Sequence, residues 1–245
     1  MTILCYHAVD PEWDSPMAVT PEAFRRQMRW LSSARRPTDL EELAGAASGV
    51  PRGAAAVTFD DGFASLWDYA FPVLRDLGVP ATVFLVAGTL TGEGRAVDWV
   101  DDPPPGRSLS SLDREQVLAM RDAGLRFGSH SLSHRVLTDL SDAELERELV
   151  GSREVLEAVL GEEVRLLAYP RGRHDARVRE AASRAGYRHA FALPEEREPG
   201  GPMAIPRVGI YRGNGLAAVR LKAASWYLPL RTGSVYRSVA RVLRG

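Results

Sequence analysis

Two histidines and two aspartates are the residues of this chain whose types and spacing suit chemistry. His130 and His134 stand four residues apart, and Asp60 is followed directly by Asp61. Two neutral imidazoles and one carboxylate occupy three positions around a zinc-like ion and leave a fourth open for water. The remaining carboxylate is then free to take a proton from that water. The combination is typical of a metal-assisted hydrolase.

The placement of these motifs tells more than either motif alone, because Asp-Asp-Gly is common in turns and histidines at this spacing are often neighbours on a helix. Each motif follows a short apolar run. The aspartates follow residues 54–59, His130 follows 125–129, His7 follows 3–6, and Tyr169-Pro170 follows 164–168. Such runs, separated by helical patterns, indicate buried parallel strands, and the catalytic groups of parallel barrels come from the carboxyl ends of several strands. We therefore expect these polar residues to meet at one end of an α/β barrel.

Capping residues and apolar periodicity predict the elements that position these residues. Thr20 followed by Pro21 begins the first helix, and Ser141 with Glu144 forms a capping box. Helices are expected over residues 20–34, 39–47, 66–77, 113–123, 141–160 and 175–185. Strands are expected over residues 3–6, 54–59, 81–86, 125–129, 164–168, 188–192 and 204–211.

The order of four motifs resembles the polysaccharide deacetylase family, the chitin-deacetylase-like carbohydrate esterases of the fourth family. The motifs are Tyr6-His7, Thr58-Phe59-Asp60-Asp61-Gly62, His130-Ser131-Leu132-Ser133-His134 and Ala168-Tyr169-Pro170-Arg171-Gly172. The resemblance runs from about Thr2 to about Tyr211. It implies a distorted parallel (β/α) barrel of about seven strands, one divalent metal ion with Zn²⁺ as first choice, and removal of an N-acetyl group from an amino sugar.

In the terms of that family, Asp61, His130 and His134 are the metal ligands and Asp60 is the general base. Adjacent residues of an extended strand point to opposite sides. Both aspartates therefore face one site only through a bend, which Gly62 permits. We expect the bend at this glycine.

The fourth motif departs from the family pattern. Many members carry Arg-Pro-Pro-Tyr, whose arginine supports the catalytic aspartate; here Ala168 and Arg171 stand in the arginine and tyrosine places. The resemblance assigns substrate and oxyanion contacts to Tyr169, Pro170 and Arg171, with the backbone N–H of Arg171 as oxyanion donor. That N–H survives any side chain. The Arg171 side chain is a candidate to meet a phosphate or carboxylate of the substrate.

The arginine that supports Asp60 must come from elsewhere in the chain. Arg207, in the late strand over residues 204–211, is our first choice. Arg165 lies inside a predicted strand with its side chain expected to point outward, and it ranks second.

The general acid must also come from a different position in the sequence than in many family members. Many members carry a late Leu-x-His motif, but no histidine follows His189. The branch that resembles poly-N-acetylglucosamine deacetylases uses an early Tyr-His instead, and His7 fits it. Histidine is suited to protonate a leaving amine near neutral pH, so His7 is the expected acid. His174 and His189 lie outside any motif, and we expect structural roles for them.

Residues 89–111 are the least regular part of the chain, with several glycines and prolines. Long loops at the catalytic end of a barrel often line the substrate site. Trp99 in this loop is expected either to stack on a sugar face or to pack on its own neighbours.

Composition limits the function classes. A chain of 245 residues suits one large α/β domain, which we place at residues 1–215, followed by a basic helical extension at residues 216–245. A formal net charge of −1 argues against general nucleic-acid binding. Cys5, the only cysteine, falls on a predicted core strand, where a buried inert thiol is expected.

The sequence has no signal-peptide pattern and no stretch of transmembrane length, so we expect a cytoplasmic protein acting on an amino sugar or glycan precursor. From Arg207 onward the chain has seven arginines, one lysine and no acidic residue, interleaved with Trp226, Tyr227, Leu228 and Leu230. This composition suits contact with an anionic membrane surface or with a glycosyltransferase. The alternative is a cationic helix that packs against the acidic remainder.

Three other functions stay open. Related barrels hydrolyse cyclic imides or ureides, sometimes without metal. A 2-His-1-carboxylate iron oxygenase is a second alternative, although that class places a carboxylate close to the first histidine and residues 131–133 are Ser-Leu-Ser. A catalytically degenerate module that binds glycan or docks on a glycosyltransferase is the third, and the complete set of metal and base residues argues against it.

Overall fold

The computed structural model describes residues 1–46, 49–91, 96–194 and 196–233. The strands in this part of the chain are β1 Thr2–Tyr6, β2 Ala8–Val9, β3 Ala18–Val19, β4 Arg36–Pro37, β5 Ala54–Phe59, β6 Ala81–Leu85, β7 Arg126–Ser129, β8 Leu166–Ala168, β9 His189–Ala192, β10 Ile205–Pro206 and β11 Val208–Gly209. The main sheet has the order β10-β9-β8-β7-β6-β5-β1-β11, with β4 beside β5. Its neighbouring strands all run parallel. A separate two-stranded ladder joins β2 to β3.

The two ends of the sheet meet in one short segment. β10 pairs with β9 and β11 pairs with β1, yet only Arg207 separates β10 from β11. The Arg207 N–H also donates to Ala192 O at 3.0 Å, and the Ile210 N–H donates to Cys5 O at 2.8 Å. The segment 205–209 therefore closes the sheet into a barrel. Counted as one strand, it completes the expected seven-stranded parallel (β/α) barrel, and the predicted fold class is confirmed.

Strand side chains alternate between the inside of the barrel and the helical layer. The inner set forms one cluster of aliphatic and aromatic residues, closed by Leu40 and Leu43 at the amino end: Ile3, Ala54, Ala56, Phe84, Leu166, Ala168, Phe191 and Ile205. Gly128 of β7 belongs to the same face, because a Cβ there would lie 2.7 Å from the Phe84 ring. The inside is a packed core, so any site must lie at an end of the barrel.

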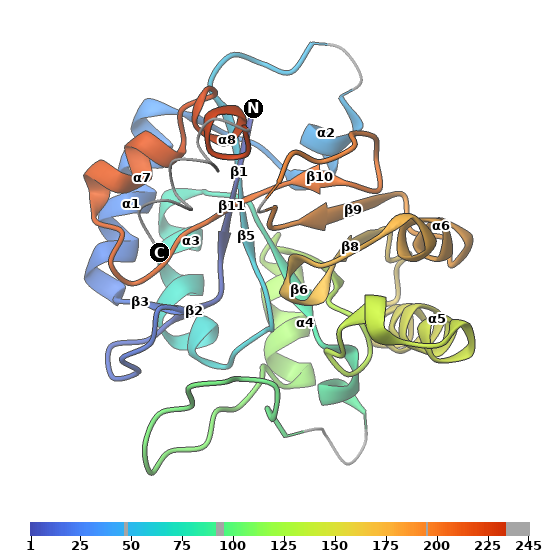
Figure 1. The fold of residues 1–245 in the computed structure, drawn as a ribbon. Coiled ribbons are helices and arrows are strands. Elements are labelled where there is room, and N and C mark those ends of the chain that lie inside the picture. Colours follow the sequence, from blue (N-terminus) through green and yellow to red (C-terminus); the bar gives the residue numbers. More distant parts are fainter. Residues whose placement is uncertain (47–48, 92–95, 195, 234–245) are drawn as a thin grey trace, which may run out of the picture.

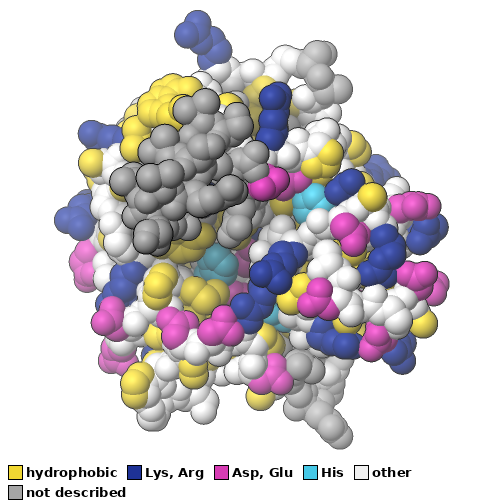
Figure 2. Space-filling model, in the orientation of Figure 1, with side chains coloured by type: hydrophobic (Ala, Val, Ile, Leu, Met, Phe, Trp, Pro, Cys, Tyr) yellow, Lys and Arg dark blue, Asp and Glu magenta, His cyan; other side chains and the backbone are white. Residues whose placement is uncertain are grey.

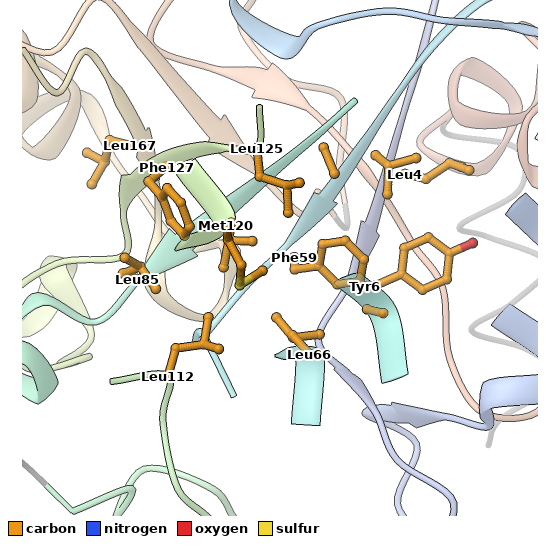
Figure 3. Close-up of a cluster of buried hydrophobic side chains, with 14 of the residues drawn as sticks. Leu4, Tyr6, Phe59, Leu66, Leu85, Leu112, Met120, Leu125, Phe127 and Leu167 are labelled. Carbon is orange, nitrogen blue, oxygen red and sulfur yellow. The ribbon is translucent and has the colours of Figure 1, made fainter. Parts of the chain in front are cut away.

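The outer set packs under the helices. Leu4, Tyr6, Phe59, Leu85 and Phe127 alternate with the inner residues and join Leu66 and Met120 in the largest cluster (Figure 3). In Figure 1, α1 and α3 lie on one side of the strands, and α5 and α6 lie on the other. The helices are α1 Pro21–Ala34, α2 Leu40–Gly45, α3 Phe71–Leu77, α4 Arg114–Asp122, α5 Asp142–Leu160, α6 Ala176–Arg184, α7 Leu216–Lys222 and α8 Tyr227–Arg231.

The predicted capping residues begin the helices as expected. Thr20 Oγ1 accepts the Ala23 N–H at the start of α1, and Ser141 forms the capping box of α5. α2 ends at Gly45 rather than at about Ala47, and Ala47 lies outside the described residues.

The helix expected over residues 66–77 is broken into two pieces. Leu66–Ala70 is a π-helical turn, in which the Phe71 N–H bonds to Leu66 O, and α3 starts at Phe71. Pro72 explains the break, because it has no N–H to offer to the carbonyl of Asp68. Gly78 ends α3 in the left-handed conformation.

The described part of the basic extension packs on the barrel. Val219 and Ala223 of α7 are buried in the main core, and Thr2 Oγ1 donates to Ala223 O at 3.0 Å. Trp226, the N-cap of α8, and Leu230 within α8 are instead more than half exposed, at 53% and 57%. Residues 234–245 of the extension lie outside the described residues. None of the described helices combines the length and the hydropathy needed to cross a bilayer.

Candidate active site

Polar residues from four segments meet at the carboxyl end of the barrel. Asp60 and Asp61 follow β5, His130 follows β7, His7 follows β1, and Arg207 lies in the closing segment. In Figure 1, β1 starts at the labelled amino terminus and runs down to the end of the molecule where the loop after β6 (green) projects. Parallel pairing brings these strand ends to one edge because β1, β5, β6 and β7 stand in register beside one another.

Asp61, His130 and His134 form a cluster with the spacing of metal ligands. Asp61 Oδ1 lies 3.8 Å from His130 Nε2 and 3.3 Å from His134 Nε2. The ligand atoms of all three lie within 4.8 Å of one another. Bonds of 2.0–2.1 Å to a tetrahedral zinc ion place neighbouring ligand atoms about 3.3 Å apart. The donor set and its spacing therefore fit one zinc-like ion.

The bend between the two aspartates begins one residue earlier than expected. Asp61 itself has φ 69°, and Gly62 follows with φ 67°. Aspartate tolerates this left-handed region better than most side chains. Gly62 is required for space as well, because a Cβ there would lie 2.6 Å from Leu85 Cδ2. The turn lets Asp60 and Asp61 address the same end of the barrel.

The two histidines belong to an irregular loop held by hydroxyl groups. Ser131 and His134 have φ 65° and 59°. Ser129 Oγ accepts the Ser131 N–H at 3.1 Å, and Ser131 Oγ accepts the His134 N–H at 3.0 Å. His130 Nδ1 lies 2.8 Å from Ala168 O. A donor at Nδ1 turns Nε2 toward the cluster, which is the usual way of orienting a metal-binding histidine.

Glu148, on the buried face of α5, accepts hydrogen bonds from the same loop. Its Oε2 accepts the N–H groups of Leu132 and Ser133 at 3.0 and 2.9 Å, and its Oε1 accepts the Ser133 hydroxyl. The carboxylate is only 5% exposed. It fixes the residues between the two histidine ligands. The sequence could have indicated this role, because Glu148 lies beside Leu145 and Leu149 on the apolar stripe of a helix, where a carboxylate needs a partner.

Asp60 is bound by Arg207 inside the barrel. Both distances, from Arg207 Nη1 to Oδ1 and from Nη2 to Oδ2, are 2.7 Å, and both side chains are buried. The guanidinium also lies over the Phe84 ring at 5.2 Å. Burial raises the pKa of Asp60, but the charge and hydrogen bonds of Arg207, together with the charges of His130 and His7, outweigh burial and hold this pKa below the usual value. Asp60 is therefore a fixed carboxylate. Arg165 points outward and pairs with Glu163 and Glu41.

His7 and Cys5 complete the surroundings of Asp60. Their ligand atoms and a carboxylate oxygen of Asp60 lie within 4.8 Å of one another. The thiol of Cys5 donates to Asp60 Oδ2 at 3.4 Å. Cys5 is buried as expected, and burial raises the pKa of its thiol well above the usual value. Among the described residues His7 Nδ1 is buried and has no hydrogen-bond partner.

Burial also sets the protonation of two cluster members. It raises the pKa of Asp61, against the opposing charge of His130. It lowers the pKa of His134 to about 2, with the charge of His130 adding to the effect. His134 is therefore a neutral imidazole at ordinary pH, which is the form that binds metal.

Residues 47–190 match the family model of polysaccharide deacetylases. The chain belongs to the polysaccharide deacetylase family. It is 26% identical over 191 residues to the poly-beta-1,6-N-acetyl-D-glucosamine N-deacetylase of Staphylococcus epidermidis, covering 73% of this chain and 62% of that enzyme's length. The fold is similar to the Streptococcus pyogenes deacetylase PplD, with TM-score 0.78, 23% identity, and coverage of 91% of this chain and 98% of PplD. It is similar to IcaB from Ammonifex degensii at TM-score 0.75, with 24% identity and coverage of 91% and 96%.

Trp99 contacts the cluster of Asp61, His130 and His134 itself. Its Nε1–H donates to Asp61 Oδ1 at 2.9 Å, and its ring stacks on His134 with centroids 5.3 Å apart. Arg171 holds the backbone of this loop, because its guanidinium donates to Trp99 O and pairs with both oxygens of Asp101 at 2.9 and 3.0 Å. Trp99 therefore packs on Asp61 and His134. Its position in the loop sequence did not predict these two partners. The Arg171 side chain, expected as a candidate for a substrate phosphate or carboxylate, pairs here with Asp101 of the protein itself.

The side chains of the Tyr169-Pro170-Arg171 stretch are engaged by residues other than the metal cluster. Tyr169 is buried among the outer cluster, with its hydroxyl donating to Met203 O at 2.9 Å. Pro170 is buried too. Arg171 has φ 56°, and its N–H bonds to no other described residue. A free N–H at the edge of the site is what an oxyanion donor needs.

The remaining histidines lie outside the metal cluster. His174 packs against Tyr169 and bridges Glu198, at 2.9 Å from Nε2, and Arg179, at 3.1 Å from Nδ1. His189 starts β9, opposite Leu166, at the amino end of the barrel. Neither reaches the aspartates.

Proposed function

We propose that this protein is a divalent-metal-dependent hydrolase that removes the N-acetyl group from an amino sugar within a glycan or glycan precursor. The observation that carries the proposal is the cluster of Asp61, His130 and His134, at 3.3–3.8 Å, beside the fixed carboxylate of Asp60. Membership of the family supports glycan N-deacetylation, and the related S. epidermidis protein bears the name of an enzyme with this reaction.

Asp61, His130 and His134 would hold the ion, with Zn²⁺ preferred because two imidazoles and one carboxylate suit it. A bound ion would polarise the acetyl carbonyl and lower the pKa of water. His130 and His134 are positioned for this by Ala168 O, by the serine hydroxyls and by Glu148.

Asp60 is the residue that takes the proton from the attacking water. Arg207 holds both of its oxygens at 2.7 Å, and the Cys5 thiol adds a weaker bond. These bonds fix the orientation of the carboxylate and keep it ionised. Orientation is the main requirement of a general base that must act in one direction.

His7 is the residue that protonates the departing amine. It lies within 4.8 Å of the Asp60 carboxylate, and its buried Nδ1 has no partner among the described residues. Of the three histidines outside the metal cluster, all in the described part of the chain, only His7 lies beside the aspartates, and histidine is suited to protonate an amine near neutral pH. The Arg171 N–H is the donor we assign to the oxyanion, since its left-handed backbone leaves it free.

An acetate-release assay tests the proposal. The protein is loaded in turn with Zn²⁺, Co²⁺ and Mg²⁺ and incubated with N-acetylated chitooligosaccharides, β-1,6-linked N-acetylglucosamine oligomers and phosphate-linked N-acetylglucosamine. Metal-dependent acetate release that chelation abolishes is the expected result. Absence of acetate from every glycan with every metal would overturn the proposal and favour a catalytically degenerate glycan-binding module.

A further inference from the structure

A cavity of about 510 Å³ lies between the loops that follow β8 and β9. The described residues that line it include four arginines and two glutamates: Arg171, Arg173, Arg179, Arg197, Glu196 and Glu198. In Figure 2, histidine side chains lie near the middle of the face with Lys or Arg side chains directly beside them. A concavity of this volume accommodates a sugar with a charged substituent.

The arginines of the cavity are not all engaged by the protein. Arg179 is held at 3.1 Å by His174, whose other nitrogen lies 2.9 Å from Glu198. Arg173 and Arg197 are exposed and have no ion-pair or hydrogen-bond partner in the described part of the chain. The cavity therefore offers uncommitted guanidinium groups. Guanidinium forks match the oxygen pairs of phosphates and carboxylates.

Arg171 connects the wall of the cavity to the Asp61 cluster by hydrogen bonds. Its guanidinium donates to Trp99 O, and Trp99 donates to Asp61 Oδ1. Asp101 forms an ion pair with Arg171. Arg173 and Arg197 therefore remain for a ligand farther along the cavity. A substrate whose acetamido group reaches Asp61 would thus have its neighbouring unit in the cavity.

We propose that this cavity binds a phosphate or carboxylate carried by the same glycan, so that the substrate is an anionic acetamido glycan rather than a neutral homopolymer. The inference rests on the proposed deacetylase function. Arg173 and Arg197 bind the anion, and Arg179, oriented by His174, forms the inner wall.

The test compares three acetylated substrates: N-acetylglucosamine 1-phosphate, a disaccharide of N-acetylglucosamine and glucuronic acid, and N-acetylated chitotriose. Arg173→Ala/Arg197→Ala is compared with Arg147→Ala, which removes an exposed arginine from α5 on another surface. We expect the double variant to raise KM for one anionic substrate roughly tenfold more than KM for chitotriose, because two exposed ionic contacts contribute about that much together. Whichever anion shows the effect, phosphate or carboxylate, is the group recognised. Equal changes for all three substrates, or the same change in Arg147→Ala, would overturn the inference.

A binding measurement separates this inference from the proposed function. Inorganic phosphate and glucuronate are titrated calorimetrically into the metal-loaded protein and both variants, at low and at high salt. Weaker binding of one of them in the double variant, with unchanged metal content and with loss of the difference at high salt, supports the anion site even if no substrate releases acetate. Identical affinities of both anions for wild type and double variant would refute it.

Discussion

Two neighbouring carboxylates have opposite surroundings in this site. Asp60 is paired with a buried guanidinium, whereas Asp61 faces two imidazoles and the Trp99 indole. Burial opposes ionisation in both, but Arg207, together with the nearby imidazoles, reverses the effect for Asp60, whereas the pKa of Asp61 stays raised. Asp60 is thereby held as an ionised carboxylate, which suits the base that we propose, and Asp61 has the surroundings of the metal ligand that we propose.

Substitution of each aspartate should separate these roles. Asp61→Asn and His134→Ala should each lose the metal, because two remaining ligands hold a zinc-like ion poorly. Asp60→Asn should retain the metal yet lose turnover by roughly 10²-fold or more. Elemental analysis of the purified variants, together with acetate release, measures both. Metal loss in Asp60→Asn with retention in Asp61→Asn would mean that the two roles are exchanged.

Replacement of His7 tests the proton donor. His7→Ala should lower kcat on the order of 10²-fold with unchanged metal content, because only the acid is removed. The alkaline limb of the rate profile should disappear as well, since it reports loss of the proton from the acid. His189→Ala is the matched control, as this histidine lies at the amino end of the barrel. A normal profile in His7→Ala would remove the assignment.

At the scale of elements, α5 controls the loop that carries the two histidines. The loop includes two left-handed non-glycine residues, Ser131 and His134, which are unfavourable without support. Glu148 of α5 provides that support by accepting two of its N–H groups and the Ser133 hydroxyl. Helix and loop therefore act together to hold His130 and His134, the metal ligands that we propose.

Glu148→Gln should weaken metal binding about 10–100-fold, the usual effect of losing a group that orients metal ligands. The amide retains the size of the side chain but places a donor where the loop offers only donors. Glu146→Gln, exposed on the same helix, is the control. Competition with a chromophoric chelator measures metal affinity, and circular dichroism checks the fold. Equal affinities for the two variants would show that the loop holds its shape without Glu148.

At the scale of the whole molecule, one short segment joins the fold to the site. Residues 205–209 close the barrel between β9 and β1 and carry Arg207 to Asp60. The ion pair consequently links the last strand segment to β5 across the interior. Loss of the arginine should affect both stability and catalysis.

Arg207→Met should destabilise the protein by about 3–5 kcal/mol, because it leaves the Asp60 carboxylate buried without its partner. Asp60→Asn/Arg207→Met should recover part of that loss, since no uncompensated charge remains. Urea denaturation of the two variants and wild type provides the comparison. A single variant no less stable than the double variant would show that the pair contributes little to closure.

The exposed apolar residues of α8 are the part of the extension that we propose for contact with an anionic membrane. Trp226→Ser/Leu230→Ser should reduce partitioning into anionic phospholipid vesicles roughly tenfold or more, given the transfer energy of two large side chains. Tyr69→Ser, which removes another exposed aromatic group, is the control. Sedimentation with vesicles measures the bound fraction. Equal partitioning of all three proteins would exclude this contact.

The sequence by itself determined the class of fold and the ends of most elements. Apolar runs with helices between them specify parallel strands, and Thr20, Asp113 and Ser141 start helices because their side chains cap local N–H groups. Polar residues directly after strands could be assigned to one end of the barrel for the same local reason. The motif order pointed to the family, which the family model then confirmed.

Only the tertiary structure decided which partners these residues have. The bond of Trp99 to Asp61, the support of the histidine loop by Glu148 and the pairing of Asp60 with Arg207 join positions 38, 15 and 147 residues apart. Such contacts depend on how the closed barrel brings separate strand ends together, and no local pattern encodes them. The cavity arginines, likewise, become one surface only because the loops after β8 and β9 stand side by side.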